Sequence, residues 1–235
     1  MVQFRMPGDA VPTSNSSGAS ASYTVADVFG GVRAREDGPQ VFLVHQMPHG
    51  ATPPHYHEVD QFQVFTTSAG KLGRKAIGAM SVHYADAYTT YGPIISEDQA
   101  VDYFTVRINA DLGAHYMPAS RKEKPRRSGR HFTVPLDEAA GETKSPIPLI
   151  ERQDDGLAAF IIKLDAGDPL ELPPLTGKGR LLTIMSGSLL TAHGLEYRDW
   201  AWGSVTATET STGCVAGNGG ASVICLDYPT TERLA

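Results

Sequence analysis

Short stretches with alternating apolar and polar positions recur along most of the chain and predict β-strands rather than helices. They are rich in β-branched and aromatic residues, which suit the pleated surface of a sheet. They span residues 40–47, 60–67, 81–88 and 101–108 in the first half, and 157–167, 180–194 and 221–229 in the second. Gly and Pro separate these stretches, and the short repeated spacing predicts an all-β sandwich or barrel.

The strand pattern is interrupted in two places, which divide the chain into segments. Residues 1–22 end in a stretch rich in Ser, Gly and Ala and predict a flexible N-terminal arm. Residues 119–148 are polar, charged and punctuated by proline, which predicts a charged, solvated linker. The remaining segments, 23–118 and 149–235, show a similar order of features and indicate an internal duplication of a β-module.

Composition narrows the classes of protein. The formal net charge is −6 and the isoelectric point about 5.7, values that do not favour nucleic acid or an anionic membrane as the partner. No window of apolar residues is long enough to span a bilayer. The two cysteines, Cys214 and Cys225, make no disulfide framework and are expected to be reduced thiols. We therefore expect a cytoplasmic protein.

The stretch PPHYHEVDQFQVF, residues 53–65, holds the strongest chemical pattern. His55 and His57 are two residues apart, so their side chains share one face of a strand. Gln61 follows, and His83 lies in a further strand-like stretch. If inward side chains of neighbouring strands face one another, these four donors can converge on one ion. Neutral imidazoles and an amide oxygen suit one divalent transition metal per chain, with Fe favoured and Mn, Ni, Co or Zn possible.

These residues resemble the motifs of the cupin superfamily. The first cupin motif reads approximately G-x5-H-x-H-x3,4-E-x6-G, and here Gly50, His55, His57 and Gln61 follow that order, with Gln61 at the usual glutamate position. His83 takes the histidine place of the second motif. The resemblance implies two jelly-roll barrels in one chain, a metal-binding N-terminal cupin and a degenerate C-terminal cupin that has no H-x-H.

The neighbours of these ligands supply candidate pocket residues. Tyr84 and Asp86 follow His83, and Asp86 suits either a general base or a group that orients His83 or a tyrosine. Arg107 alternates with Tyr103 and Thr105 on one predicted strand. It suits a bidentate clamp for a substrate carboxylate, or a residue on the outer surface of the strand. Tyr84, Asp86 and Arg107 are the predicted catalytic residues.

Three classes of function remain open at this point. Three histidines and a glutamine carry no charge, so the metal keeps its full charge and favours an anionic oxygen of a small substrate. An Fe(II)-type dioxygenase acting on an enol, phenol or carboxylate is favoured, because the resemblance extends to quercetin dioxygenase-like bicupins. A non-redox isomerase or lyase of sugar acids and a non-catalytic ligand-binding bicupin are the alternatives. A homodimer is possible, since closed symmetric dimers are the commonest assembly.

Overall fold

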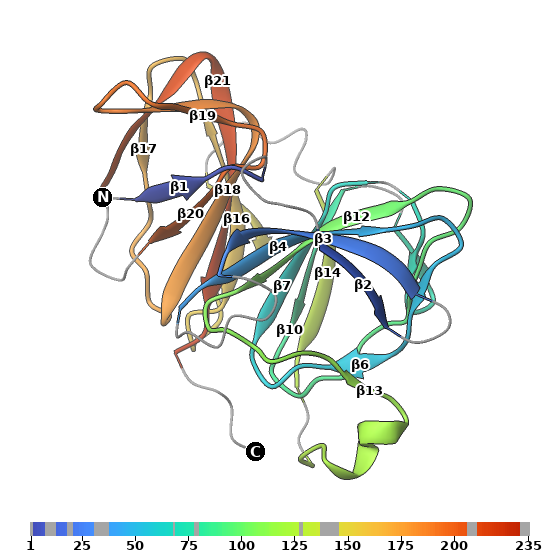
Figure 1. Ribbon diagram of the computed structural model, residues 1–235. Helices are drawn as coiled ribbons and strands as arrows, with labels where there is room; N and C mark the ends of the chain where they lie inside the picture. Colours follow the sequence, from blue (N-terminus) through green and yellow to red (C-terminus); the bar gives the residue numbers. More distant parts are fainter. Residues whose placement is uncertain are drawn as a thin grey trace. The chain divides into compact units, whose positions relative to one another are not determined.

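The computed structural model describes residues 2–7, 13–17, 21–30, 38–67, 69–77, 80–126, 129–136, 146–205 and 211–230. Within these residues the protein is almost entirely β-structure (Figure 1). The exception with defined bounds is a single 3₁₀ turn, η3 (Ala119–Lys122). No helix among the described residues is long and apolar enough to cross a membrane. The prediction of an all-β protein is confirmed.

The chain forms two compact units. The N-terminal unit comprises Ala10–Asp137 and Glu232–Ala235, and the C-terminal unit comprises Met1–Asp9 and Glu138–Thr231. Each unit is built around a large antiparallel sheet. Two strands lie inside residues 1–22, where the sequence predicts a flexible arm: β1 (Gln3–Arg5) pairs in the C-terminal unit, and β2 (Thr13–Ser17) in the N-terminal unit.

The main sheet of the N-terminal unit has seven strands. Their spatial order is β14 (His131–Pro135), β10 (Ser81–Ala85), β7 (Gln61–Phe65), β12 (Val101–Arg107), β4 (Gln40–Gln46), β3 (Ala21–Phe29) and β2. The edge strand β14 comes from the segment predicted to be a charged linker, and it pairs with β10 along its full length. Most residues of β10, β7 and β12 are buried on both faces of the sheet.

Two small sheets complete the N-terminal unit. One has four short strands in the order β5 (Ala51–Thr52), β11 (Ile94–Ile95), β8 (Lys71–Leu72) and β9 (Lys75–Ala76). The other pairs β6 (His55–Tyr56) with β13 (His115–Tyr116). An apolar cluster that includes Phe42, Phe65, Ile94 and Tyr103 connects the main sheet to the four-stranded one.

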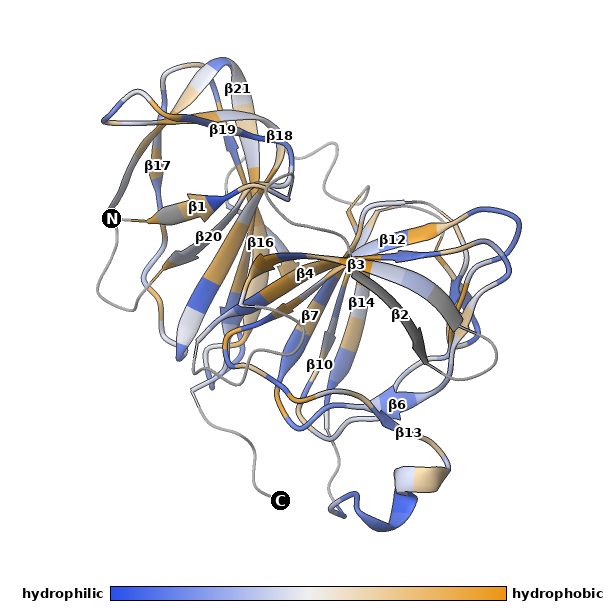
Figure 2. Cartoon of the chain, viewed as in Figure 1, coloured by the Kyte–Doolittle hydropathy of each residue, from blue (hydrophilic) through white to orange (hydrophobic). Residues whose placement is uncertain are grey.

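The C-terminal unit has one eight-stranded sheet. Its main path runs β1, β20 (Trp202–Val205), β18 (Gly179–Thr191), β21 (Ser211–Tyr228), β16 (Ala158–Leu164) and β15 (Ile147–Ile150), with β17 (Pro169–Glu171) on β21 and β19 (Glu196–Arg198) on β18. Leu182, Ile184, Phe160, Ile162 and Val223 belong to its buried apolar cluster. Figure 2 shows hydrophobic colouring along β16, in contrast to the hydrophilic colouring of β6 in the N-terminal unit.

Candidate functional site

A row of polar side chains crosses the interior of the N-terminal sheet. Side chains alternate between the two faces of a strand, so Gln61 and Gln63 of β7 share a face, while Phe62 and Val64 point to the other. The register places His83 of β10 opposite Gln63, and Gln63 opposite Thr105 of β12. Three neighbouring strands therefore present polar groups on the same buried face.

Two further histidines come from the segment around β6. The backbone N–H and C=O groups of His55 bond to those of Tyr91, each at 3.1 Å, which fixes the two residues side by side. His57 follows β6 directly, and the centroids of the His55 and His57 rings are 5.2 Å apart. His55 and His57 are 4% and 8% exposed, and His83 is 1% exposed. The predicted histidines are therefore all interior side chains.

Each of these imidazoles uses its Nδ1 atom toward an outer partner. His55 Nδ1 donates to the Pro53 carbonyl at 2.7 Å, and His57 Nδ1 donates to the Asp111 carboxylate at 2.6 Å. A carbonyl and a carboxylate only accept, so both rings carry their proton on Nδ1 and leave a lone pair on Nε2. His83 Nδ1 bonds to the Thr133 hydroxyl at 2.8 Å.

The Nε2 atom of His83 differs from those of the other two histidines. It is buried, and no hydrogen bond to it is found among the described residues. The backbone of Phe132 also interacts with this ring, and a backbone carbonyl that bonds a ring nitrogen accepts a proton from it. Since Nε2 has no partner, that proton lies on Nδ1. All three rings thus carry an Nε2 lone pair.

Burial keeps these rings neutral at physiological pH. Desolvation lowers the pKa of His55 to about 4. Desolvation, followed by repulsion from Arg107, lowers the pKa of His57 to about 3. Desolvation, followed by repulsion from His131, lowers the pKa of His83 to about 3. Neutral imidazole is the form that binds metal ions, so little proton competition remains near pH 7.

Tyr91 stands between the histidines, although the sequence pattern did not single it out. Its hydroxyl lies 2.9 Å from His55 Nε2 and also bonds to Gln61 Nε2. Its ring centroid is 4.6 Å from that of His55, 5.1 Å from that of His83 and 6.5 Å from that of His57. Two of the four predicted donors, His55 and Gln61, therefore contact the phenol oxygen of Tyr91, and the rings of His57 and His83 lie near its ring.

Arg107 is buried in the same site, at 3% exposure. Its Nε and one terminal nitrogen donate to Gln61 Oε1 at 3.0 and 2.9 Å, and the other terminal nitrogen donates to Gln40 Oε1 at 2.6 Å. Its guanidinium also lies 3.7 Å from the Asp111 carboxylate and 3.2 Å from His57 Nε2. The alternative that Arg107 is a residue of the outer surface is therefore wrong.

These contacts determine which atom of Gln61 faces the centre. A guanidinium has donors only, so the amide atom that receives two of its N–H groups must be the oxygen. The amide nitrogen of Gln61 is thereby turned toward Tyr91. An amide nitrogen has no lone pair available for a metal. Gln61 is in place beside the histidines, but its oxygen, the predicted donor, bonds to Arg107.

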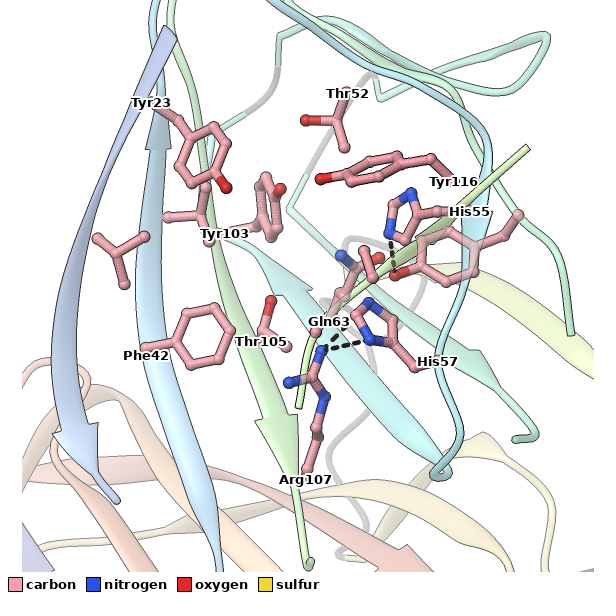
Figure 3. Close-up of a pocket in the computed structure, with 15 residues that line it drawn as sticks. Tyr23, Phe42, Thr52, His55, His57, Gln63, Tyr103, Thr105, Arg107 and Tyr116 are labelled. Carbon is pink, nitrogen blue, oxygen red and sulfur yellow. Dashed lines mark hydrogen bonds between the residues drawn. The ribbon is translucent and has the colours of Figure 1, made fainter. Parts of the chain in front are cut away.

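A cavity of about 130 Å³ opens beside this cluster (Figure 3). Figure 3 shows Arg107 directed toward His57 at one end, and the tyrosine side chains around the other. The wall is formed by Tyr23, Val25, Phe42, Val44, Thr52, His55, His57, Gln63, Tyr91, Tyr103, Thr105, Arg107, Gly113, Ala114 and Tyr116. The oxygen of Gln63 is buried there without a hydrogen-bond partner among the described residues.

Tyr84 and Asp86, predicted as catalytic residues, do not line this cavity. Tyr84 alternates with His83 on β10, so it points to the opposite face, where it packs on Phe62. Its hydroxyl donates to Asp86 at 2.7 Å, and Asp86 also accepts from Arg130. Although burial opposes it, hydrogen bonding from Arg130 holds the pKa of Asp86 below its usual value. Asp86 therefore links the end of β10 to the residue before β14, and neither Tyr84 nor Asp86 lines the cavity.

Asp111 is a further residue that sequence reasoning missed. Besides its bond to His57, it accepts the backbone N–H of Gly113 at 3.1 Å. Burial works against its ionisation, but the hydrogen bond from His57, together with the positive charge of Arg107, lowers its pKa to about 2. Asp111 therefore stays anionic and holds the His57 ring in one tautomer. Only its position after β12 could have signalled this role.

The fold of the chain is that of cupin proteins, as comparison with solved structures shows. No family model matches the sequence, and no curated protein matches it. A candidate dioxygenase from Nostoc punctiforme PCC 73102 matches with a TM-score of 0.69 at 10% identity, covering 100% of this chain and 85% of that one. The pirin YhhW of Escherichia coli in complex with nickel(II) gives 0.56 at 9% identity, covering 98% and 100%.

A third match is the oxalate decarboxylase of Lactobacillus farciminis in its formate complex. Its TM-score is 0.55 at 10% identity, and the match covers 98% of this chain and 87% of that one. Identities this low establish a shared fold and leave the chemistry to the site itself. The expected cupin fold is therefore confirmed.

Proposed function

We propose that the N-terminal unit binds one divalent transition metal and is the active site of a metal-dependent cupin enzyme. His55, His57 and His83 would hold the ion through Nε2. The observation that carries this proposal is the buried Nε2 atom of His83, which has no hydrogen-bond partner among the described residues. A buried polar atom without a partner costs free energy, which a bound cation would recover.

The donor chemistry fits a borderline divalent metal. All three imidazoles are neutral, and each is oriented by an outer partner: the Pro53 carbonyl, the Asp111 carboxylate and the Thr133 hydroxyl. Iron, nickel, manganese, cobalt and zinc all accept such ligands, and iron is our first choice. The nickel(II) named for the pirin and the oxygenase named for the Nostoc protein agree with this reading.

The reaction we favour is an Fe(II)-type oxygenation of a small enol, phenol or carboxylate. When bound, the metal would act as a Lewis acid and offer a place for the substrate and oxygen. Arg107 is the ionised side chain of the cavity wall, and it attracts an anionic group of the substrate. The oxygen of Gln63 would accept a hydrogen bond from a substrate hydroxyl.

The cavity wall also favours a planar and partly apolar substrate. Phe42 and Tyr103 offer ring surfaces, while Thr105 offers a hydroxyl beside Gln63. Enclosure by these side chains excludes bulk water and strengthens the attraction between Arg107 and an anion. We therefore place the negatively charged end of the substrate near Arg107 and its ring among the aromatic side chains.

Metal analysis of the purified protein tests the first part of the proposal. We expect close to one equivalent of transition metal, lost in His55→Ala and retained in His193→Ala, which changes an exposed histidine of the C-terminal unit. Less than about a tenth of an equivalent in the wild type, unchanged by His55→Ala after reloading, would contradict metal binding.

Oxygen uptake with a panel of enols, phenols and catechols tests the reaction class. We expect substrate-dependent uptake that is abolished in His55→Ala. Turnover that persists under strict anaerobiosis would contradict the oxygenase and favour the non-redox isomerase or lyase.

A metal-free ligand-binding cupin is the second candidate, and one observation favours it. Among the described residues, no group of three His, Cys, Asp or Glu side chains is placed to hold a metal ion. The buried cation Arg107 lies against His57, where it would repel a dication. Ligand-induced thermal stabilisation without metal and without product would support this second function.

A further inference from the structure

One side of the cavity consists of inward side chains of neighbouring strands, arranged in rows across the sheet. The register places Gln63 of β7 opposite Thr105 of β12, and Thr105 opposite Phe42 of β4. On β12, Arg107 lies two residues after Thr105 and Tyr103 two residues before it, and two residues of a strand span about 7 Å. This side of the cavity therefore changes from a cationic row through a polar row to a row that holds a tyrosine.

The middle row contains an oxygen atom that the described part of the chain leaves without a donor. Gln63 is 2% exposed and lines the cavity, and its Oε1 atom is buried with no hydrogen-bond partner among the described residues. Gln61, on the same face of β7, differs because its oxygen accepts two N–H groups of Arg107. A buried amide oxygen without a donor costs free energy, and a ligand hydroxyl in the cavity would recover it.

The positive charge of Arg107 lies close to the row of Gln63. The central carbon of its guanidinium is 5.5 Å from the centre of the Phe42 ring, which belongs to that row. The Asp111 carboxylate, 3.7 Å from the guanidinium, does not line the cavity, so the charge that the wall presents to a ligand is positive. One small ligand can therefore direct an anionic group toward Arg107 and a hydroxyl toward Gln63.

The volume of the cavity limits the ligand to one ring. The cavity measures about 130 Å³. An enclosed cavity of about 150 Å³ accommodates a single benzene molecule. Most of the lining residues are buried, and the half-buried or exposed ones, which form the mouth, are Tyr23, Gly113, Ala114 and Tyr116. A compound with two or three rings would leave at least one ring outside the buried part of the cavity.

We propose that the cavity selects a single-ring aromatic carboxylate with a hydroxyl group on the ring, and that Gln63 is the residue that recognises the hydroxyl. The inference rests on the proposed function for the place of the substrate, and it does not require the metal to be bound. The carboxylate lies toward Arg107 and the hydroxyl donates to Gln63 Oε1. Because an ortho hydroxyl bonds to its own carboxylate, the hydroxyl that reaches Gln63 is at the meta or para position.

Calorimetric titration of the metal-free, full-length protein with a series of related ligands tests this selection. We expect meta- or para-hydroxybenzoate to bind about tenfold more tightly than benzoate, because benzoate leaves the oxygen of Gln63 unpaired. We expect ortho-hydroxybenzoate to bind as weakly as benzoate. Quercetin, whose three rings exceed the cavity, should neither bind nor displace the hydroxybenzoate.

Gln63→Leu removes the acceptor and keeps a side chain of similar size. We expect this variant to bind benzoate and the hydroxybenzoates with equal affinity, a change of preference that a merely structural role would not produce. Gln99→Leu alters an exposed glutamine of the same unit and should keep the wild-type preference. Circular dichroism shows whether each variant is folded, and the ligand series on the wild type tests the inference without any substitution.

The outcomes separate this inference from the proposed function, because transition-metal content is measured on the same preparations. Equal affinities of the wild type for benzoate and the hydroxybenzoates, or a preference that Gln63→Leu retains, would overturn the role of Gln63. Tighter binding of quercetin than of the hydroxybenzoates would overturn the size limit. A wild-type protein that holds one equivalent of metal and binds none of the ligands would overturn this inference alone. A preference for hydroxybenzoate in a protein with no affinity for metal would overturn the metal site and support the inference.

Discussion

Both units build antiparallel sheets over an apolar cluster, but the N-terminal unit also buries a set of polar side chains beside a cavity. In the C-terminal unit, the inward positions of β16, β18 and β21 hold Phe160, Leu182, Ile184 and Val223 in one apolar cluster. In the N-terminal unit, the corresponding interior holds histidines, glutamines and Arg107 beside a cavity. An apolar interior gains stability from every buried side chain, whereas a polar one must satisfy each group.

The buried arginines show the same difference on a smaller scale. Arg180 of the C-terminal unit is fully buried and donates to both oxygens of Asp227, with 2.8 Å at one of them, while Arg152 adds a further bond. Arg107 of the N-terminal unit divides its donors between two glutamine oxygens and lies against a histidine. The Arg180–Asp227 pair is fully buried and structural, whereas Arg107 lines a cavity. We infer that function resides in the N-terminal unit.

Acidification should destabilise the N-terminal unit more than the C-terminal unit, and this is the largest effect we expect, because the N-terminal unit buries His55, His57 and His83. The folded-state pKa values of His55, His57 and His83 are about 4, 3 and 3, below the ordinary value of 6.5. Between pH 6.5 and the folded-state pKa of each histidine, the unfolded chain binds a proton that the folded chain does not. Stability is therefore complete above about pH 6.5 and falls as the pH is lowered toward 4, by up to about 1.4 kcal/mol per pH unit for each histidine.

Urea unfolding of the metal-free protein at a series of pH values measures this loss. Both tryptophans, Trp200 and Trp202, lie in the C-terminal unit, so their fluorescence reports on that unit, whereas far-ultraviolet circular dichroism reports on the whole chain. We expect the circular dichroism transition to shift first. His55→Gln should flatten the pH dependence. Equal acid sensitivity of both signals would contradict a polar interior confined to one unit.

Arg180→Met should give the next largest effect, in the opposite unit. It leaves the fully buried Asp227 with only the exposed Arg152 as an ionic partner, and we expect a loss of about 3–5 kcal/mol in the free energy of unfolding. Tryptophan fluorescence in urea measures it. Arg198→Met removes an exposed ion pair instead, and we expect its urea transition to lie close to that of the wild type. Metal binding that falls with Arg180→Met in the folded protein would contradict a purely structural role.

Tyr84→Phe should have the smallest effect. It tests whether the functional site includes side chains on the face of β10 that points away from the cavity. It removes the hydrogen bond to Asp86, which keeps its contacts with Arg130, so we expect a cost of about 1 kcal/mol. Metal content and oxygen uptake should remain at the wild-type level, because Tyr84 points away from the cavity. A loss of activity comparable to that of His55→Ala would place Tyr84 in the catalytic machinery.

The outcome for position 61 shows where sequence reasoning stopped. Its spacing from His57 predicts a ligand, and the structure does bring Gln61 beside the histidines. Which amide atom faces the centre depends on Arg107, which is distant in the chain. A motif gives the place of a side chain but not the hydrogen bonds that orient it. Tyr84 was predicted as a pocket residue but points away from the cavity, because a shift of one position along a strand moves a side chain to the opposite face of the sheet.

By itself, the sequence determined the central strands of each unit, the candidate histidines and the neutral charge of the predicted ligand set, because alternation and spacing are local properties; it missed β1, β2 and β14. The tertiary structure alone decided the partners: Asp111 at His57, Thr133 at His83, and Tyr91 between His55 and Gln61. These contacts join residues 30 to 54 positions apart in the chain. The register of β10 and β14 brings His83 to Thr133, and the loops that follow the strands carry Asp111 and Tyr91 to the histidines, so tertiary structure and not the order of the chain sets which side chains meet.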